Sequence, residues 1–317
     1  MSLRTERRPD RGTVTSSLEA VRPSGRGRRD RDAERSRNAD GSVRSPWSSI
    51  GARAVLIAMS LLFLVPIYWM VISALKGNTE LGAFPPTWFP QWIDWSNFGK
   101  AVDAMPFFTF FRNTLVITAA VTLFSMVSNL VIAYGFACID WRGRDKVFYV
   151  VLATLFIPFP VTLIPMFDLY ARLGWINTFL PLIVPSLFGS AFYVFLLRQF
   201  LLQIPKDLLD AARMDGASEW RILWRIVFPQ AKAALVTVGI FAAVGAWNDF
   251  LGPLIYLQDE RVQTLSIGLQ VFRLNNAADF QFNQLMAASI LIILPLVVLF
   301  FFFQRSFLRG VQIGSFK

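Results

Sequence analysis

The sequence predicts an all-α polytopic membrane protein with six transmembrane helices and one cytoplasmic helical loop. The chain has 317 residues, of which 55% are hydrophobic and 16% are charged, whereas soluble domains usually have about a quarter charged residues. Thirty-one Phe and ten Trp add more apolar aromatic surface than a single core of this length buries. Membrane lipid is therefore the expected surrounding of most of the chain.

The same composition excludes several kinds of catalytic chemistry. The chain has no His and one Cys, so it cannot form a Ser-His-Asp or Cys-His triad, a His-ligated metal site or a disulfide framework of its own. It also lacks the G-x-x-x-x-G-K-[ST] phosphate loop. We predict that the protein is not an enzyme, that it has no catalytic residue, metal or cofactor, and that any energy source is a partner.

Residues 1–50 are expected to form a disordered, Arg-rich cytoplasmic tail, and residues 51–317 a transmembrane domain. The tail contains twelve Arg and seven acidic residues but almost no aromatic or branched apolar ones, too few to offset the entropy lost on ordering. It holds half of the net charge of +10, and the rest lies near the ends of the apolar segments. The charge therefore predicts no nucleic-acid partner.

Six mostly apolar segments follow the tail, and each is long enough to cross a hydrocarbon core of roughly 30 Å as a helix. The predicted spans are Ala54–Leu75, Phe110–Ile139, Val147–Leu169, Phe179–Leu202, Ala233–Tyr256 and Leu285–Phe303. The first is too long for a signal-peptide core, so we expect no cleavage. The third contains Pro158, Pro160 and Pro165, so we expect it to be kinked and to lie inside the bundle.

The distribution of Lys and Arg predicts the orientation. If the tail, the 142–146 turn, the 198–232 loop and the C-terminal segment share one side, that side has 25 basic residues and the other has 6. Segments rich in Lys and Arg stay in the cytoplasm. Both termini are therefore expected on the cytoplasmic side of the membrane.

The loop at residues 203–230 is too charged for the bilayer and has the periodicity of two short helices. Pro205 suits the start of the first helix, and Gly216 suits its end because glycine readily adopts a positive φ. Ser218 is a suitable N-cap for the second helix, where Glu219 meets the positive end of the helix dipole.

The two predicted helices have different surfaces. The second carries an apolar stripe that is expected to lie along the membrane or the bundle, formed by Trp220, Leu223, Trp224, Val227 and Phe228. The first presents charged residues around two small ones, an arrangement that suits docking to another protein: Lys206, Asp207, Asp210 and Arg213 around Ala211 and Ala212. The periodicity alone is equally that of an amphipathic surface hairpin.

The segment DAARMDGA at residues 210–217, followed by Ile226, Phe228 and Pro229, resembles the EAA motif of bacterial ABC importer permeases. Other segments agree in order, namely FRNTL from Phe111, IPKDLLDAA from Ile204, AWNDFLGPL from Ala246 and the C-terminal QRSFLRGVQIGSFK. Over about residues 54–317 the chain is similar to carbohydrate-importer permeases of the maltose and glycerol-3-phosphate type.

This resemblance implies an ABC type I importer permease fold. The expected partners are a second homologous permease, two ATP-hydrolysing subunits and an extracytoplasmic solute-binding protein. The motif implies a set of residues that couple to the ATPase: Asp210, Ala211, Ala212, Asp215, Gly216, Ala217 and Pro229. The chain departs from the family at Asp210, where Glu is usual, and in its long Arg-rich tail. The shorter carboxylate would need a closer approach to a basic group of the ATPase.

Polar residues within the spans are the candidates for the solute path because they are costly in lipid. These candidates are Asn113, Asn129, Trp247, Asn248 and Asp249. The alternative for the Asn residues is a hydrogen bond between helices, and for Trp247 it is simple packing. The carboxylate of Asp249 needs either an oppositely charged partner or contact with water on the outer side of the membrane. Arg112, at a matching depth on the second span, is the expected partner.

Two other classes of function stay open from the sequence, a polytopic membrane enzyme and an ion-driven secondary transporter. The spans lack a cluster of acids, bases or metal ligands, and only Asp249 and Asp168 approach the bilayer interior, fewer than a secondary transporter would need. The sequence does not reveal the solute.

The predicted orientation can be tested with single Cys residues in a Cys138→Ser background. A membrane-impermeant thiol reagent added outside intact cells should modify Cys at position 275 but not Cys at position 218. Labelling of position 218 but not of position 275 would show that the orientation is the opposite of the predicted one.

Overall fold

The computed structural model describes the backbone of residues 46–275 and 281–312, and the side chains of residues 50–274 and 281–303. Most of the predicted tail therefore lies outside the described residues. The chain divides into two compact units, Met1–Val65 and Pro66–Lys317. The described residues are mainly helical and contain no strand, which confirms the all-α fold class.

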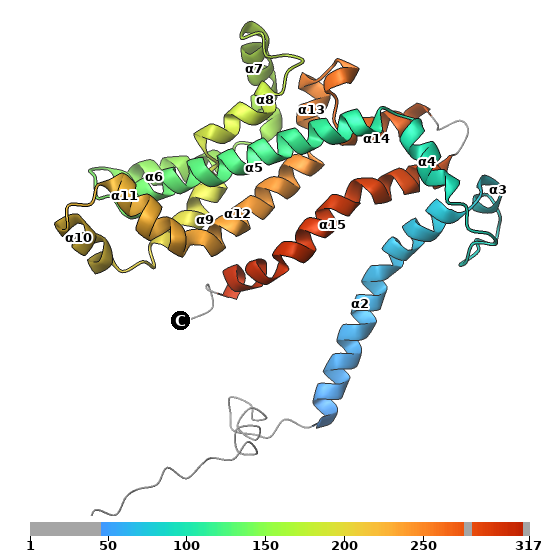
Figure 1. The fold of residues 1–317 in the computed structure, drawn as a ribbon, viewed down its shortest axis with the longest axis horizontal. Helices are drawn as coiled ribbons and strands as arrows, with labels where there is room; N and C mark the ends of the chain where they lie inside the picture. Colours follow the sequence, from blue (N-terminus) through green and yellow to red (C-terminus); the bar gives the residue numbers. More distant parts are fainter. Residues whose placement is uncertain (1–45, 276–280, 313–317) are drawn as a thin grey trace, which may run out of the picture. The chain divides into compact units, whose positions relative to one another are not determined.

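Five helices or joined helices are long and apolar enough to cross a membrane, and a bent pair makes the sixth span if it is counted as one. The spans are formed by α2 (Pro46–Leu75), α5 (Phe107–Ala137), the bent pair α6 (Arg144–Ala153) and α7 (Phe159–Arg172), α8 (Leu180–Ile183) with α9 (Ala191–Leu201), α11 (Glu219–Ile222) with α12 (Phe228–Asn248), and α15 (Phe282–Gln312). The connecting helices are α3 (Asn78–Leu81), α4 (Ser96–Asp103), α10 (Lys206–Met214), α13 (Leu251–Tyr256) and α14 (Leu265–Asn275) (Figure 1).

The third span is bent by 97° between α6 and α7, at two of the three prolines that the sequence singles out, whereas Pro165 lies inside α7. Pro158 is the N-cap of α7 and Pro160 follows in its first turn, where a missing N–H leaves no carbonyl without a donor. The expected position inside the bundle is wrong for this chain, because Phe156 and Ile164 are 88% and 76% exposed. A proline at a helix start does not require neighbouring helices to satisfy its backbone.

The fifth span begins earlier and ends earlier than the sequence predicts. The helix runs from Glu219 to Asn248, so the second loop helix is the first part of this span and is not a separate surface helix. The link is a π-helical segment at Leu223–Val227, where the Phe228 N–H bonds the carbonyl of Leu223, five residues back. The segment predicted as the outer end of the span is the separate helix α13.

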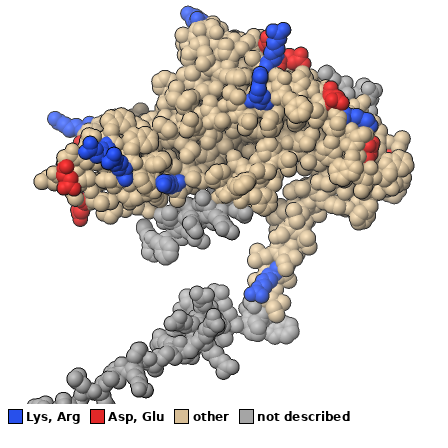
Figure 2. Space-filling view, in the orientation of Figure 1, with Lys and Arg blue, Asp and Glu red and all other residues tan. Residues whose placement is uncertain are grey.

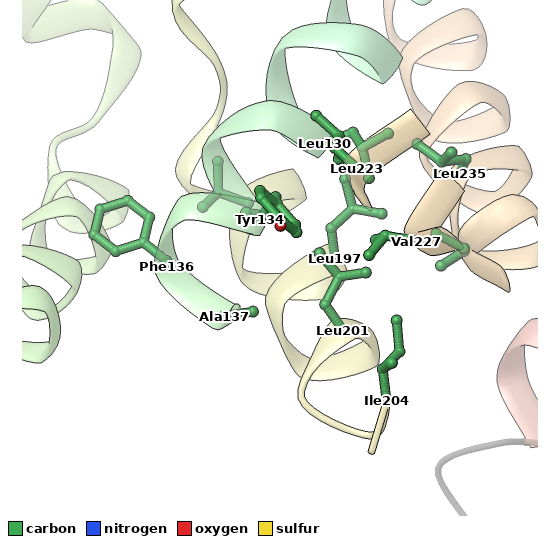
Figure 3. Packing of buried hydrophobic residues seen from close by; sticks show 14 of the residues in the cluster. Leu130, Tyr134, Phe136, Ala137, Leu197, Leu201, Ile204, Leu223, Val227 and Leu235 are labelled. Atoms are coloured by element: carbon green, nitrogen blue, oxygen red, sulfur yellow. The ribbon is translucent and has the colours of Figure 1, made fainter. Parts of the chain in front are cut away.

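The main core lies where α5, α9 and α12 pack together, next to the 203–218 loop (Figure 1). Leu130, Leu197 and Leu223 are each at most 2% exposed, and Figure 3 shows their side chains facing one another. The core continues to Ile204 at the start of the loop and to Val227 in the π-helical segment. The loop thus packs against the same hydrophobic core that holds the spans together.

A second contact joins the end of α2 to α4 and α15 through buried amides. The Asn97 side chain donates to the carbonyls of Ala74 and Lys76, at 2.9 and 3.0 Å. The Asn283 amide donates to the same Lys76 carbonyl and to Asn97 Oδ1. These bonds satisfy the carbonyl groups where α2 ends.

Candidate functional site

The loop helix α10 has well-defined ends, as the sequence predicts. Pro205 precedes its first residue, and Gly216 follows it with φ of +75°. The Gly216 N–H bonds the carbonyl of Arg213 and the Ala217 N–H bonds that of Ala212, which is the Schellman arrangement of a helix C-terminus. Gly216 is therefore required by the backbone, because few other residues adopt this φ without strain.

The two faces of α10 differ in exposure. Leu209 and Ala212 belong to the main core, at 3% and 8% exposed, so the expectation that Ala212 contacts a partner is wrong. The periodicity of a short helix places Ala211 and Ala212 on different faces, and only Ala211 is exposed. Leu208 and Met214 are 43% and 88% exposed. They form an apolar surface with Ala211.

Three acidic side chains and one basic side chain, that of Lys206 at 73% exposed, surround this apolar surface of α10. Asp207 and Asp215 are exposed, and the side chain of Asp210 is 63% exposed. Figure 2 shows charged side chains gathered at the end of the second unit that carries α10 and α11. The surface fits an apolar groove with basic groups at its edge.

Arg213 faces the bundle and bonds three different acceptors. Its guanidinium donates to Asp210 Oδ1 at 2.8 Å, to Glu219 Oε1 at 2.9 Å and to the carbonyl of Cys138 at 2.8 Å. The hydrogen bond to Glu219 is the main cause that raises the pKa of Arg213. Asp210, which the sequence assigns to the ATPase, thus already has an intramolecular partner, while most of its carboxylate surface stays exposed.

Glu219 connects this network to α5. Its carboxylate also accepts a hydrogen bond from the hydroxyl of Tyr134, a residue that is 3% exposed in the last turn of α5. Sequence reasoning missed Tyr134, because nothing in its local sequence marks it. The opposite charges at 213 and 219 on either side of Gly216 were a signal for the Arg213–Glu219 pair.

The remaining predicted coupling residues lie near the start of the fifth span. Ser218 is the N-cap of α11, as predicted, but its side chain makes no capping bond, so Ser218 contributes its backbone carbonyl to Ile222. Pro229 is in the first turn of α12, directly after the π-helical segment. Proline has no N–H to donate to the carbonyl four residues back. The missing donor is consistent with the change from α-helical to π-helical hydrogen bonding just before Pro229.

The two predicted solute-path asparagines on α5 hold other segments in place. Asn113 is 1% exposed and donates to the carbonyls of Arg261 and Gln263, both at 2.9 Å. Asn129 is fully buried and accepts from the Ser190 N–H at 2.7 Å, next to Gly189, where the fourth span is broken. Their amides are used within the chain, as in the alternative reading.

The two candidates at the end of α12 are also bonded within the chain. The indole of Trp247, which is 5% exposed, donates to the carbonyl of Ile292 at 3.1 Å. Asn248 is exposed and donates to the carbonyl of Val244 in its own helix. Neither residue lines the cavity described next.

Asp249 lines a cavity whose described lining includes none of the other predicted path residues. This cavity has a volume of about 300 Å³ and lies between α5, α8, α9, α12 and α13. Its polar lining residues are Thr114, Ser125, Tyr193, Asp249 and Thr264. The volume is at the lower end of the range for small-molecule sites, about 300 to 1,000 Å³.

The predicted ion pair between Asp249 and Arg112 is wrong. Asp249 takes part in no ion pair among the described side chains, and Arg112 is exposed. The carboxylate instead accepts from the Gly252 N–H at 3.2 Å, where the helix is broken between α12 and α13. The free backbone donors at this break satisfy one carboxylate oxygen without a cation.

Comparison with known protein families gives a match over residues 129–313, more than half of the chain, to the binding-protein-dependent transport system inner membrane component family. The chain belongs to this family. It is therefore the permease subunit of a binding-protein-dependent importer and a multi-pass membrane protein, as the resemblance predicts. This membership supports the permease over the secondary transporter and the membrane enzyme that the sequence left open.

Several curated relatives match the permease over most of its length. The arabinooligosaccharides transport system permease protein AraQ of Bacillus subtilis is 34% identical over 262 residues, which are 82% of this chain and 92% of the relative. The sn-glycerol-3-phosphate transport system permease protein UgpE of Yersinia enterocolitica is 31% identical, covering 83% and 95%. The diacetylchitobiose uptake system permease protein NgcG of Streptomyces coelicolor is 28% identical, covering 84% and 88%.

Solved structures agree with the fold of the permease. A bacterial ABC transporter involved in the import of the acidic polysaccharide alginate matches with a TM-score of 0.70 and 23% identity, covering 82% of this chain and 98% of that chain. A bacterial alginate ABC transporter in complex with its alginate pentasaccharide-bound periplasmic protein matches with a TM-score of 0.60 and 17% identity, covering 81% and 95%. Both confirm the importer permease fold.

We predict that Gly216→Val loosens the end of α10 and that Gly216→Asn does not. A Cβ at this position would meet no atom within 4 Å, so the whole effect comes from the positive φ, about 1 to 3 kcal/mol for a β-branched residue, while Asn tolerates this conformation. Trypsin should cleave the purified Val variant after Lys206 or Arg213 at least about fivefold faster than the parent. Equal cleavage rates in the parent and both variants would contradict the prediction.

Proposed function

We propose that this permease imports a neutral carbohydrate, with a second permease, two ATP-hydrolysing subunits and an extracytoplasmic solute-binding protein as its partners. The observation that carries the proposal is the capped helix α10, which holds an exposed apolar surface with an acidic edge outside the apolar spans. A lone permease has no use for such a surface. A docked ATPase would use it, and α10 overlaps the EAA-like segment over residues 210–214.

The coupling residues have distinct roles in this proposal. The surface of Leu208, Ala211 and Met214 enters a groove of the ATPase, and Asp207 and Asp215 meet basic groups at its edge. Gly216 and Ala217 form the turn that fixes α10, and Ala212 roots it in the core. Pro229 lies at the change of register in the fifth span.

The chemistry of the cavity supports a neutral sugar as the solute. No Lys or Arg is among its described lining residues, and Asp249 adds a carboxylate, which would repel phosphate or uronate groups. Hydroxyl groups donate and accept, and a carboxylate accepts, the hydrogen bonds that sugar hydroxyls form. Two of the relatives are named for arabinooligosaccharides and diacetylchitobiose, which carry no charge, and these match the chemistry of the cavity better than the relative named for sn-glycerol-3-phosphate.

The proposed path passes this cavity at Asp249, and the other polar candidates have supporting positions around it. Asn113 holds the 261–263 segment, next to the lining residue Thr264. Asn129 holds the break in the fourth span between the lining residues Leu182 and Tyr193. Both termini lie in the cytoplasm in this proposal, together with α10.

We predict that Met214→Glu weakens binding of the ATPase without affecting the fold. Met214 is 88% exposed, so the new carboxylate is solvated in the free permease but would have to be buried, unpaired, at the apolar contact. ATPase recovered with a tagged permease should fall at least about tenfold. Gln230→Glu adds the same charge at another exposed position and should leave recovery unchanged. Full recovery with the Met214 variant would contradict the proposed docking surface.

We predict that Asp249→Asn lowers uptake more than assembly. Asn keeps an oxygen for the Gly252 N–H but removes the charge that strengthens a bond to a sugar hydroxyl, worth about 1.5 to 3 kcal/mol. Uptake of radiolabelled solute should therefore fall by about tenfold or more, while the yield of purified complex stays within twofold. Asn248→Ala, outside the cavity, should leave uptake unchanged. A complex yield that falls in step with uptake would make Asp249 structural.

A further inference from the structure

Apolar packing attaches α10 to the bundle through a small contact. Leu209 and Ala212 are its buried side chains, and a crevice of about 50 Å³ separates the helix from the ends of α5 and α9. A nine-residue helix attached only by these two apolar side chains would change its angle to the bundle when a partner moves it. Its attachment therefore depends on polar contacts.

Arg213 supplies the largest set of these contacts. One planar guanidinium bonds Glu219 at the start of α11 and the Cys138 carbonyl at the end of α5. The rigid fork of Arg fixes the directions of both bonds, which a flexible Lys would not do. The Asp210 carboxylate, one turn earlier in α10, accepts a hydrogen bond from the same guanidinium.

Glu219 closes the network from the opposite side. Its second oxygen accepts from the Tyr134 hydroxyl in the last turn of α5, so the carboxylate bonds α10 and α5 at once. Glu219 is also the first residue of a helix of 30 residues that ends at Asn248, about 45 Å away by helical rise. The three side chains thus join α10, α5 and the fifth span at one place.

Both spans joined here also line the cavity toward their other ends, together with α8, α9 and α13. The lining residues include Thr114 and Ile117 of α5, and Gly245 and Ala246 of α12, with Asp249 directly after it. Along most of their length α5 and α12 pack against each other through the main core. A displacement of α10 that moves both helix ends therefore reaches the cavity from two sides.

From this arrangement we infer that Arg213, Glu219 and Tyr134 form a clamp that makes α10 move as one body with α5 and the fifth span. The inference rests on the proposed ATPase docking at α10 and adds the positioning residues that carry its movement inward. Arg213, Glu219 and Tyr134 touch neither the solute nor the nucleotide. They act by holding the docking helix to the spans.

The test is a double-mutant cycle in the complete importer, reconstituted with its ATPase subunits and its solute-loaded binding protein. The variants are Arg213→Gln, Glu219→Gln, the double variant, and Tyr134→Phe. Arg221→Gln is the matched control, because Arg221 is exposed on α11 and takes part in no ion pair among the described side chains. Each complex is assayed for ATPase recovery, for basal ATP hydrolysis, and for hydrolysis stimulated by the loaded binding protein.

The clamp predicts that recovery and basal hydrolysis stay within twofold, while stimulated hydrolysis and uptake fall by about tenfold in either single variant. The double variant should lose no more than the worse single variant, because both substitutions break one unit. Tyr134→Phe should give a smaller loss, and Arg221→Gln none. Additive losses, normal stimulation in both single variants, or a loss of ATPase recovery that accounts for the lost stimulation would overturn the clamp.

These outcomes are separable from a failure of the proposed docking surface. If Met214→Glu retains the ATPase, α10 is not where the ATPase binds. If Met214→Glu releases the ATPase but Glu219→Gln keeps normal stimulation, the docking surface stands and the clamp is wrong.

Discussion

The third and fourth spans of this permease are interrupted helices, and the fifth is broken where it meets α13. An interrupted helix in lipid must satisfy its freed backbone groups within the protein. The fourth span is broken at Gly189, where Asn129 accepts the next N–H. The fifth is broken after Asn248, where the Asp249 carboxylate accepts from Gly252 and its carbonyl accepts from Ser266. Asn129 and Asp249 are thus the polar residues that these two breaks require, and the cavity lining includes Asp249 together with Leu182 and Tyr193 on the two sides of the break in the fourth span.

The same constraint explains how one short helix outside the spans acts on them. The last turn of α5 has carbonyl groups without helical partners, and Arg213 bonds one of them. Glu219 begins the fifth span with a negative charge, which the helix dipole favours. The ends of two spans thus provide the partners that orient α10, and docking and movement share one set of contacts.

The sequence predicts the parts of this fold that depend on local chemistry. The apolar segments give the spans, and Gly216 gives the end of α10 with its positive φ. The sequence does not predict the features that depend on how the helices pack. Pro158 predicts a break in the third span but not the exposure of Ile164, which follows it. The fifth span begins at Glu219, but the charges of Arg221 and Arg225 make this first part resemble a loop in the sequence.

The candidate site shows a similar division. The EAA-like segment is readable from residue types and spacing, whereas Asn113 and Asn129 look functional by their cost in lipid until their acceptors and donors are known. Tyr134 has no signal of its own, because its bond joins residues 85 positions apart. A single sequence gives no means to infer such a long-range contact.

The central claim is that α10, the end of α5 and the start of the fifth span move together, and distances between spin labels test it most directly. Labels replace the exposed residues Lys206, Arg142 and Lys232 in pairs, in a Cys138→Ser background and in the assembled importer. Distances are measured without nucleotide and with ATP trapped. The account predicts that the three mean distances are the same in both states. Changes in both Lys206 pairs, with the Arg142–Lys232 distance constant, would contradict it.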